Sequence, residues 1–252
     1  MKAVVLGSVG YHPNERRHTS CILFPAHGLV LDAGTGFFRI RKHIQTTSLE
    51  ICLSHAHLDH VVGLTYLLNI LRKSDVEHIV IRGEAEKLLA VEKHLFSDLI
   101  FPVPIAADWI ALEEGPLEIM GGGKLTHFPL DDHPGGTVGY RIDQGGASFA
   151  YVADTCVREQ PSYLEAIRGV DVLVHECNFR DGSEELAAKS GHSCTSQVAQ
   201  LAARAEVGRL IMTHFDTLEE GDDPVGLESA RALFPSTDLA EDGMEIEIPS
   251  AV

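Results

Sequence analysis

The amino-acid sequence predicts an α/β protein, a four-layer αββα sandwich in which two β-sheets face each other between two layers of helices. Short apolar runs that end at Gly, Pro or Asn occur in both halves of the chain, and helical patterns accompany each half. No repeat, linker or low-complexity segment divides the 252 residues. Since both sheets must bury an apolar face, they do so best by packing against each other inside the helices. We therefore expect residues 1–252 to form a single domain.

The first half of the chain begins with strands that turns separate. Apolar or β-branched runs predict strands at residues 2–6, 19–24, 29–31 and 49–53. After Asp59 the apolar residues recur at helical spacing from Val61 to Leu71, which predicts a helix. A second helix is expected over residues 84–96.

The second half repeats this alternation. Strands are expected within residues 109–128, and Gln144-Gly145-Gly146 predicts the turn of a hairpin between residues 138–142 and 148–152. The remaining patterns predict strands at 170–174 and 209–213 and helices at 195–205 and 224–233. Thr195 or Ser196 is the expected N-cap of the helix at 195–205.

Composition and charge restrict the partners of the chain. Hydrophobic residues make up 44% and charged residues 23%, the proportions of a globular protein with a full core. Thirty-seven acidic residues against 20 basic ones give a net charge of −17. This charge is unfavourable for wide binding to a polyanion, because phosphate contacts need clustered Lys and Arg.

The sequence also gives expectations about location and redox state. The apolar stretch at residues 61–71 is about half the length of a membrane span, and residues 1–7 are too short for the apolar part of a signal peptide. We therefore expect a cytoplasmic protein with no membrane partner. Five cysteines, with no C-x-x-C pair among them, argue against a disulfide framework and against a cysteine-based zinc ribbon.

A cluster of four potential metal ligands directly follows the apolar strand at 49–53. The cluster comprises His55, His57, Asp59 and His60. Side chains at positions 55 and 57 project to the same side of an extended chain, so both imidazoles can bind one ion. Asp59 and His60 lie where the chain turns into a helix and can bind a second ion. Four such residues in six positions argue against a His-rich loop without metal.

Two ions need further ligands from distant loops. The candidates are His133, Asp154 and His214. Asp154 and His214 each lie just past the carboxyl end of a predicted strand, where open α/β sheets place their sites. His133 lies in a loop rich in Gly and Pro. Taken alone, each residue is more typical of a helix cap or of the protein surface. Only the cluster at 55–60 makes them candidate metal ligands.

The order of these motifs resembles the metallo-β-lactamase superfamily, and the resemblance covers the chain from Leu6 to His214. The details look most like the ribonuclease Z group and its small phosphodiesterase relatives. Four shorter segments carry that likeness: Arg17-His18-Thr19-Ser20-Cys21, Leu31-Asp32-Ala33-Gly34-Thr35-Gly36, His175-Glu176-Cys177 and Gly191-His192-Ser193-Cys194-Thr195.

The resemblance implies a binuclear metal site, the four-layer αββα fold and a homodimer. It assigns His55, His57 and His133 to one ion. It assigns Asp59, His60 and His214 to the other, with Asp154 as the bridge. Zinc is the implied metal, and manganese or iron also suits such nitrogen and oxygen ligands. The β-lactamase branch has a Cys among its ligands where this chain has Asp154, which argues against antibiotic hydrolysis. His57 stands where flavo-diiron proteins have an acid.

The resemblance also implies a metal-dependent hydrolase that attacks a phosphodiester with a metal-activated hydroxide. Asp59 belongs to the catalytic set, together with Glu176 and His192, which resemble the pair that protonates the leaving alkoxide. As an alternative, His192 only caps the helix near Thr195. A glyoxalase II-like thioester or lactone hydrolase is a second interpretation. It differs from the first in not requiring Glu176 and His192, since a thiolate leaves without a proton. A non-catalytic metal-binding protein is a third, and it would lack a ligand or the acid.

The expected substrate follows from a difference between this chain and the ribonuclease Z enzymes. Ribonuclease Z enzymes project a long tRNA-binding arm between the residues that correspond to His133 and Asp154. Here only 154 − 133 = 21 positions separate them, and the predicted hairpin occupies nearly all of these. We therefore expect a small or cyclic phosphodiester, bound with help from Arg16, Arg17 or Arg39. RNA is less expected, and ribonuclease Z-like tRNA 3′ processing stays the alternative.

Overall fold

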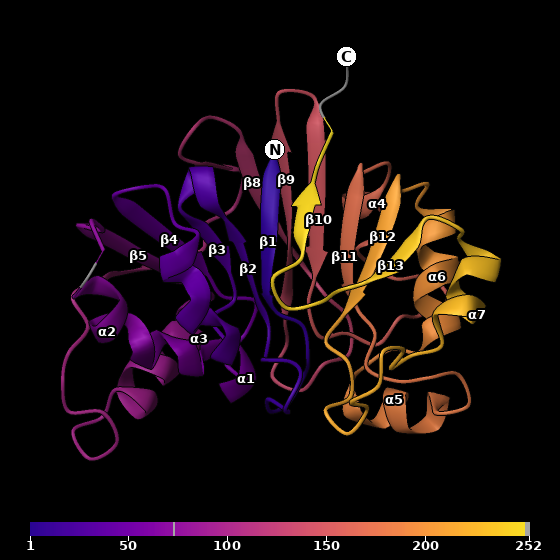
Figure 1. Cartoon of the computed structure of the whole chain (residues 1–252), viewed down its shortest axis with the longest axis horizontal. Coiled ribbons are helices and arrows are strands. Elements are labelled where there is room, and N and C mark those ends of the chain that lie inside the picture. The colour runs from indigo at the N-terminus through magenta and orange to yellow at the C-terminus, as the bar shows by residue number, and fades with distance from the viewer. Residues whose placement is uncertain (73, 250–252) are drawn as a thin grey trace.

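The computed structural model describes residues 1–72 and 74–249, in which two sheets of seven strands face each other (Figure 1). The first sheet has the order β14-β1-β2-β3-β4-β5-β6. Its strands are β1 (Lys2–Gly7), β2 (Cys21–Phe24), β3 (Leu29–Leu31), β4 (Ser48–Cys52), β5 (His78–Gly83), β6 (Asp108–Ala111) and β14 (Glu245–Glu247). Strands β3 to β6 run parallel to one another, whereas β14, β1, β2 and β3 pair antiparallel.

The second sheet has the order β13-β12-β11-β10-β9-β8-β7. Its strands are β7 (Leu117–Glu118), β8 (Lys124–Pro129), β9 (Val138–Gln144), β10 (Ala147–Val152), β11 (Val172–Glu176), β12 (Arg209–Thr213) and β13 (Thr237–Leu239). The predicted hairpin forms between β9 and β10. Strands β10 to β13 are parallel, so their carboxyl ends meet at one edge of the sheet.

Helices cover the outer face of each sheet, which confirms the predicted four layers. The α-helices are α1 (Leu58–Val61), α2 (Leu67–Leu71), α3 (Ala85–Ala90), α4 (Leu164–Ile167), α5 (Glu184–Ser190), α6 (Thr195–Arg204) and α7 (Leu227–Leu233). The remaining turns are the 3-10 helices η1 (Pro25–His27), η2 (Thr35–Lys42) and η3 (Val62–Tyr66) and the π-helical turn η4 (Val91–Leu95). Figure 1 places α1–α3 beside the first sheet and α4–α7 beside the second. Within the part of the chain described, no helix is long and apolar enough to cross a membrane.

The main core lies between the sheets. Phe24 of β2 meets Phe149 of β10 edge to face, with ring centroids 5.1 Å apart. Such edge-to-face pairs are favourable because the positive ring edge faces the negative ring face. A second cluster lies between the first sheet and its helices and includes Val30, Ile51 and Leu67. Both sheet faces are thus buried, which holds the carboxyl ends of the central strands in fixed positions.

Three predicted helices differ in detail from the structure. The helix expected after Asp59 starts at Leu58 and continues as η3 and α2 rather than as one helix. Residues 84–96 form α3 and then η4. The helix expected from residue 224 begins only at Leu227, because the Asp223 carboxylate accepts hydrogen bonds from the amides of Gly226 and Leu227.

The N-cap of α6 is Cys194, so the expectation of Thr195 or Ser196 is wrong. The Cys194 amide is satisfied by the Gln197 side chain at 2.8 Å. The Ser196 hydroxyl instead donates to Asp181, and the buried Thr195 hydroxyl donates to the Val225 carbonyl. The predictions also missed the short helices α4 and α5, the 3-10 helices η1 and η2, and the strands β5, β13 and β14.

Candidate metal centre

The residues after β4 form a tight turn into α1 that brings the first four predicted ligands together. His57 is the N-cap of α1, so Asp59 and His60 occupy its first turn. The rings of His55 and His57 lie 4.5 Å apart, and those of His55 and His60 lie 4.2 Å apart. The turn into this short helix therefore brings the side chains of the cluster close to one another, as the spacing predicts.

Residues from the second sheet complete two groups of donor atoms. The first donor group comprises His55, His57, His133 and Asp154. The second donor group comprises Asp59, His60, Asp154 and His214. Within each group the donor atoms lie within 4.8 Å of one another. The structure thus brings together all seven residues that the sequence predicts as ligands, in the predicted division.

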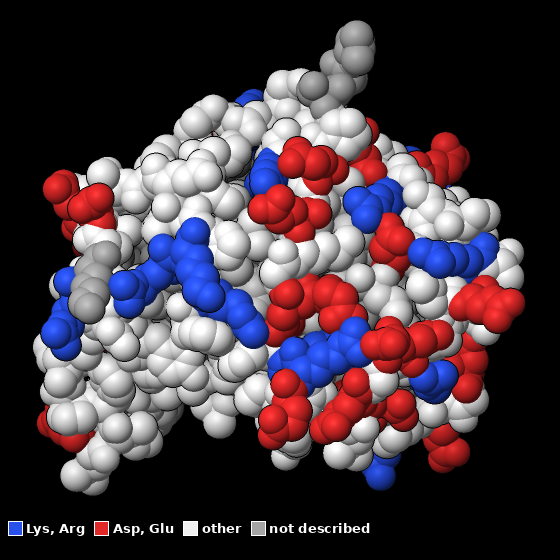
Figure 2. Space-filling view, viewed as in Figure 1, with Lys and Arg blue, Asp and Glu red and all other residues white. Residues whose placement is uncertain are grey.

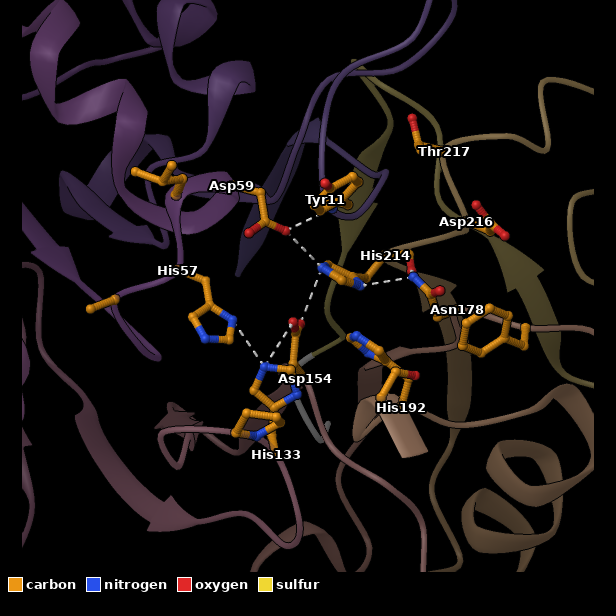
Figure 3. A pocket seen from close by; sticks show the side chains of 15 residues that line it. Tyr11, His57, Asp59, His133, Asp154, Asn178, His192, His214, Asp216 and Thr217 are labelled. Atoms are coloured by element: carbon orange, nitrogen blue, oxygen red, sulfur yellow. Dashed lines mark hydrogen bonds and ion pairs between the residues drawn. The ribbon is translucent and has the colours of Figure 1, made fainter. Parts of the chain in front are cut away.

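Asp154 is shared because its two carboxylate oxygens face different groups. Oδ2 lies 3.7 Å from His55 Nε2 and 3.6 Å from His133 Nε2. Oδ1 lies 3.3 Å from His60 Nε2 and 3.2 Å from His214 Nε2. Figure 3 shows Asp154 between His133 and His214, on the loop that follows β10.

Hydrogen bonds on the far side of the rings fix which nitrogen faces each group. His60 Nδ1 lies 2.8 Å from Asp32 Oδ2, and His133 Nδ1 lies 3.0 Å from the Gly191 carbonyl. Both partners can only accept, so both Nδ1 atoms carry the proton when the rings are neutral. The Nε2 lone pairs of His60 and His133 then face the donor groups, as metal-ligating imidazoles require.

The arrangement of donor atoms fits divalent cations. His55 Nε2 and Asp154 Oδ1 are buried and have no hydrogen-bond partner among the described residues. Buried polar atoms without partners are costly unless an ion or water satisfies them. In the second donor group neighbouring donor atoms lie 3.2–3.4 Å apart. A tetrahedral ion with ligands at about 2.0–2.1 Å needs donor atoms about 3.4 Å apart.

The charges of the two groups are strongly coupled. Burial alone would lower the pKa of His60, but the carboxylates of Asp154, Asp59 and Asp32 raise this pKa well above its usual value. Burial would raise the pKa of Asp154, yet His214 and His60 hold it well below its usual range. Burial lowers the pKa of His133 to about 4. The carboxylates are therefore ionised and available to a cation.

Glu176 and His192 lie beside the second donor group. Glu176 is the last residue of β11 and is fully buried, and its Oε2 lies 3.6 Å from His192 Nδ1. The His192 ring stacks on the His214 ring at 5.3 Å. Burial opposes charge on His192, but the Glu176 carboxylate raises its pKa to about 9. Since Cys194 caps α6, the alternative of His192 as a helix cap is wrong.

Backbone strain is concentrated around the site. Five described residues other than glycine have positive φ, and four of them lie at or near the donor groups: Tyr11, Asp32, Asp132 and His214. Such left-handed conformations are unfavourable for residues with a Cβ atom and persist only where packing enforces them. The Gly10 backbone also touches the His214 ring so closely that a Cβ atom at Gly10 would overlap it.

The groups open into a cavity of about 650 Å³ that Tyr11, His57, Asp154, Asn178 and Asp216 line together with ten further residues. None of the lining residues in the described chain is Lys or Arg. The three arginines that the sequence predicted as phosphodiester ligands, Arg16, Arg17 and Arg39, instead form ion pairs outside the cavity. Arg16 and Arg17 bond to Glu241, and Arg39 pairs with Asp242. Figure 2 shows basic and acidic side chains interleaved on the right half of one face, and a group of basic side chains with few acidic neighbours on the left half.

Residues 27–215, three quarters of the chain, match the Beta-lactamase superfamily domain. The chain belongs to this superfamily. Membership, together with the two donor groups, identifies it as a metal-dependent hydrolase whose His and Asp residues suit divalent cations.

Relatives in sequence and structure confirm the resemblance to the ribonuclease Z group. A ribonuclease Z from Thermobifida fusca is 26% identical over 98% of this chain and 94% of its own length. A ribonuclease Z from Methanothermobacter thermautotrophicus is 40% identical over 103 residues, only 33% of its length. The metallo-beta-lactamase fold protein YhfI from Bacillus subtilis has a TM-score of 0.79 at 23% identity, covering 98% of this chain and 99% of its own. The short form of human tRNase Z has a TM-score of 0.76 at 22% identity, covering 99% and 100%. At these identities the structural likeness concerns the fold.

Sequence reasoning missed the residues that support the ligands. Asp32 accepts hydrogen bonds from Ser54, His60 and Tyr151, a supporting role that the family resemblance alone did not predict. The Tyr11 amide donates to Asp59 Oδ2 at 2.8 Å from a loop near the start of the chain. An acid directly after a buried strand was the available signal for Asp32. Nothing in the local pattern distinguishes Tyr11.

Proposed function

We propose that this protein is a binuclear phosphodiesterase that hydrolyses a small or cyclic phosphodiester. The observation that carries the proposal is the Asp154 carboxylate, with one oxygen toward each donor group. Zinc is the proposed metal, with manganese or iron as substitutes, because all seven ligands offer nitrogen or oxygen. When bound, two such cations supply positive charge to the phosphodiester and make a water molecule acidic enough to act as the nucleophile near neutral pH.

The protein's own groups then have separate tasks. His55, His57 and His133 would hold one cation, Asp59, His60 and His214 would hold the other, and Asp154 would contribute a carboxylate oxygen to each. His192 donates a proton to the leaving alkoxide, and the buried Glu176 carboxylate 3.6 Å away keeps the ring charged and oriented. Thioester hydrolysis would not require Glu176 and His192, since a thiolate leaves unprotonated. A protein that only stores or senses metal would have no need of them either.

The cavity and the chain length support a small substrate over tRNA. No Lys or Arg among the described residues lines the cavity, and a wide RNA contact needs several such residues. The alignment with the Thermobifida fusca relative spans 308 positions, so at least 308 − 252 = 56 of them are absent from this chain. The names of these relatives favour tRNA 3′ processing as the second candidate function.

The decisive experiment is an activity panel with the metal-replete protein. It compares kcat/KM for a small diester, a cyclic nucleotide, a pre-tRNA and a thioester at physiological salt. The small or cyclic diester is expected to be the best substrate. A preference for pre-tRNA by orders of magnitude would establish the second candidate instead.

Light scattering on the same sample tests the homodimer, which the family resemblance implies and which stays a prediction.

Substitution of His192 tests the role of the acid. In His192→Ala, hydrolysis of a diester with a poor alkoxide leaving group should slow by about 100-fold or more, the usual worth of a positioned general acid. A nitrophenolate leaves readily without a proton, so its release should slow far less. Equal losses on both substrates would assign His192 to positioning rather than to proton transfer.

A further inference from the structure

The cavity has a second lining beside the donor groups, formed by Tyr11, Leu58, Phe179 and Asp216, which we call the outer wall. Tyr11 is 79% exposed and Leu58 is 67% exposed, although both are large apolar residues. Phe179 also lines the cavity, with its ring 6.2 Å from that of His192. Apolar surface exposed in a cleft rather than scattered over the molecule is typical of a ligand-binding surface.

The position of Tyr11 is fixed although its ring is exposed. Its amide donates to Asp59 Oδ2 at 2.8 Å, and its backbone is left-handed with φ 59°. The next residue is also held, because the Thr217 hydroxyl donates to the His12 carbonyl at 2.8 Å. A strained backbone that holds an aromatic ring at the mouth of a cavity is a feature of pre-organised binding sites.

Asp216 gives the outer wall a negative charge. Its Oδ1 accepts the Leu218 amide at 3.0 Å, and its own amide donates to the Asn178 carbonyl at 3.0 Å, so the residue is anchored at the cavity edge. The cavity residues that the structure describes include no Lys or Arg to offset it. A neutral hydroxyl can donate to this carboxylate, whereas a second anionic group on a substrate would be repelled.

We propose that the outer wall binds the non-leaving ester group of a nucleoside phosphodiester that carries a single negative charge. This inference rests on the proposed function, because the phosphodiester itself must lie at the donor groups. The nucleobase lies against the Tyr11 ring, since every base has a flat face that stacks on an aromatic side chain. A sugar hydroxyl donates to Asp216. A cavity of about 650 Å³ holds a nucleoside ester but not a folded RNA.

The first test compares two esters with the same leaving group and the same charge. Thymidine 5′-(4-nitrophenyl phosphate) carries a nucleoside, and methyl 4-nitrophenyl phosphate does not. We expect kcat/KM to be at least about 10-fold higher for the thymidine ester, the range of a base stacked on an aromatic ring. Tyr11→Ala should remove most of this preference, because kcat/KM should fall far more for the thymidine ester than for the methyl ester. Tyr11→Phe should retain it, and Phe38→Ala, which changes an exposed aromatic outside the cavity, is the control.

The second test adds charge to the substrate. The thymidine ester with a 3′-phosphate should react at least about 10-fold more slowly than the ester with a free 3′-hydroxyl. Asp216→Asn should narrow this ratio several-fold, whereas Glu220→Gln, a matched change at an exposed position outside the cavity, should not. Equal rates for the two thymidine esters would overturn the role of Asp216.

The outcomes separate this inference from the proposed function. Hydrolysis of the thymidine and methyl esters with equal kcat/KM would leave the phosphodiesterase intact and overturn the outer wall as a nucleoside site. The same conclusion follows if Tyr11→Ala slows both esters equally, since Tyr11 then acts only through Asp59. Failure to hydrolyse either ester would overturn the proposed function and, with it, the inference.

Discussion

The two donor groups differ in how firmly the protein holds them. All four residues of the second donor group are buried, and its neighbouring donor atoms lie 3.2–3.4 Å apart. In the first donor group His57 is exposed to the cavity, and the separations range from 3.1 to 3.7 Å. Asp32 fixes His60 from behind, whereas His57 has no such carboxylate among its described partners. The second donor group is therefore pre-organised, and the first is the more adaptable.

Asp154→Ala is expected to have the largest effect because this residue belongs to both groups. Without its carboxylate each group loses one ligand and the shared negative charge. We expect metal content to fall from about two ions per chain to less than one, with activity lost. Elemental analysis after dialysis measures this. Retention of one full ion would show that one group binds metal independently of Asp154.

Gly10→Ala should separate the two groups. A Cβ atom at this position would overlap the His214 ring, so the second donor group is expected to lose its ion while the first keeps its own. Gly221→Ala is the matched control, because a Cβ atom there has open space around it. Metal analysis and the circular dichroism of both variants check the result. Loss of the fold in Gly10→Ala alone would mean that Gly10 is needed for packing rather than for the ligand.

Asp32→Asn should give an intermediate effect confined to the second donor group. Asn can still meet Ser54, but it no longer holds the His60 imidazole with a charge. Loss of such a supporting carboxylate lowers metal affinity by about 10- to 100-fold. Titration with a competing chelator should show one weakened site and one unchanged site. Equal weakening of both would contradict an action of Asp32 through His60 alone.

Ser54→Ala is expected to have the smallest effect. The Ser54 hydroxyl lies 3.0 Å from His55 Nδ1 and donates to Asp32 at 2.8 Å. Because a neutral hydrogen bond is worth about 0.5–1.5 kcal/mol, affinity at the first donor group should fall only a few-fold. The same chelator titration measures it. A loss as large as that of Asp32→Asn would place His55 among the pre-organised ligands.

The sequence contained the ligand set because local geometry determines most of it. His55 and His57 follow a strand, and Asp59 and His60 open a helix, so neighbouring positions point to neighbouring places. Asp154 follows β10 and His214 follows β12, two parallel strands whose carboxyl ends meet at the same edge. The two-sheet architecture follows from the same patterns.

The rest depends on contacts between distant segments, which no local pattern contains. The Arg residues expected to meet a substrate are paired with Glu241 and Asp242 near the end of the chain. Tyr11 reaches the site because its amide bonds to Asp59, 48 positions later. The break of the predicted helix into α1, η3 and α2 follows from tertiary packing, since Gly63 lies against the backbone of Ala33 and Gly34.

Each donor group draws ligands from both sheets, and this has a thermodynamic consequence. Strand β4 and helix α1 supply His55 through His60, whereas the second sheet supplies His133, Asp154 and His214. A cation bound by both sheets binds the folded chain alone, so it raises the free energy of unfolding in proportion to the logarithm of its concentration. The melting temperature of this protein should therefore report free metal concentration, and a chelator should lower it without any change in sequence.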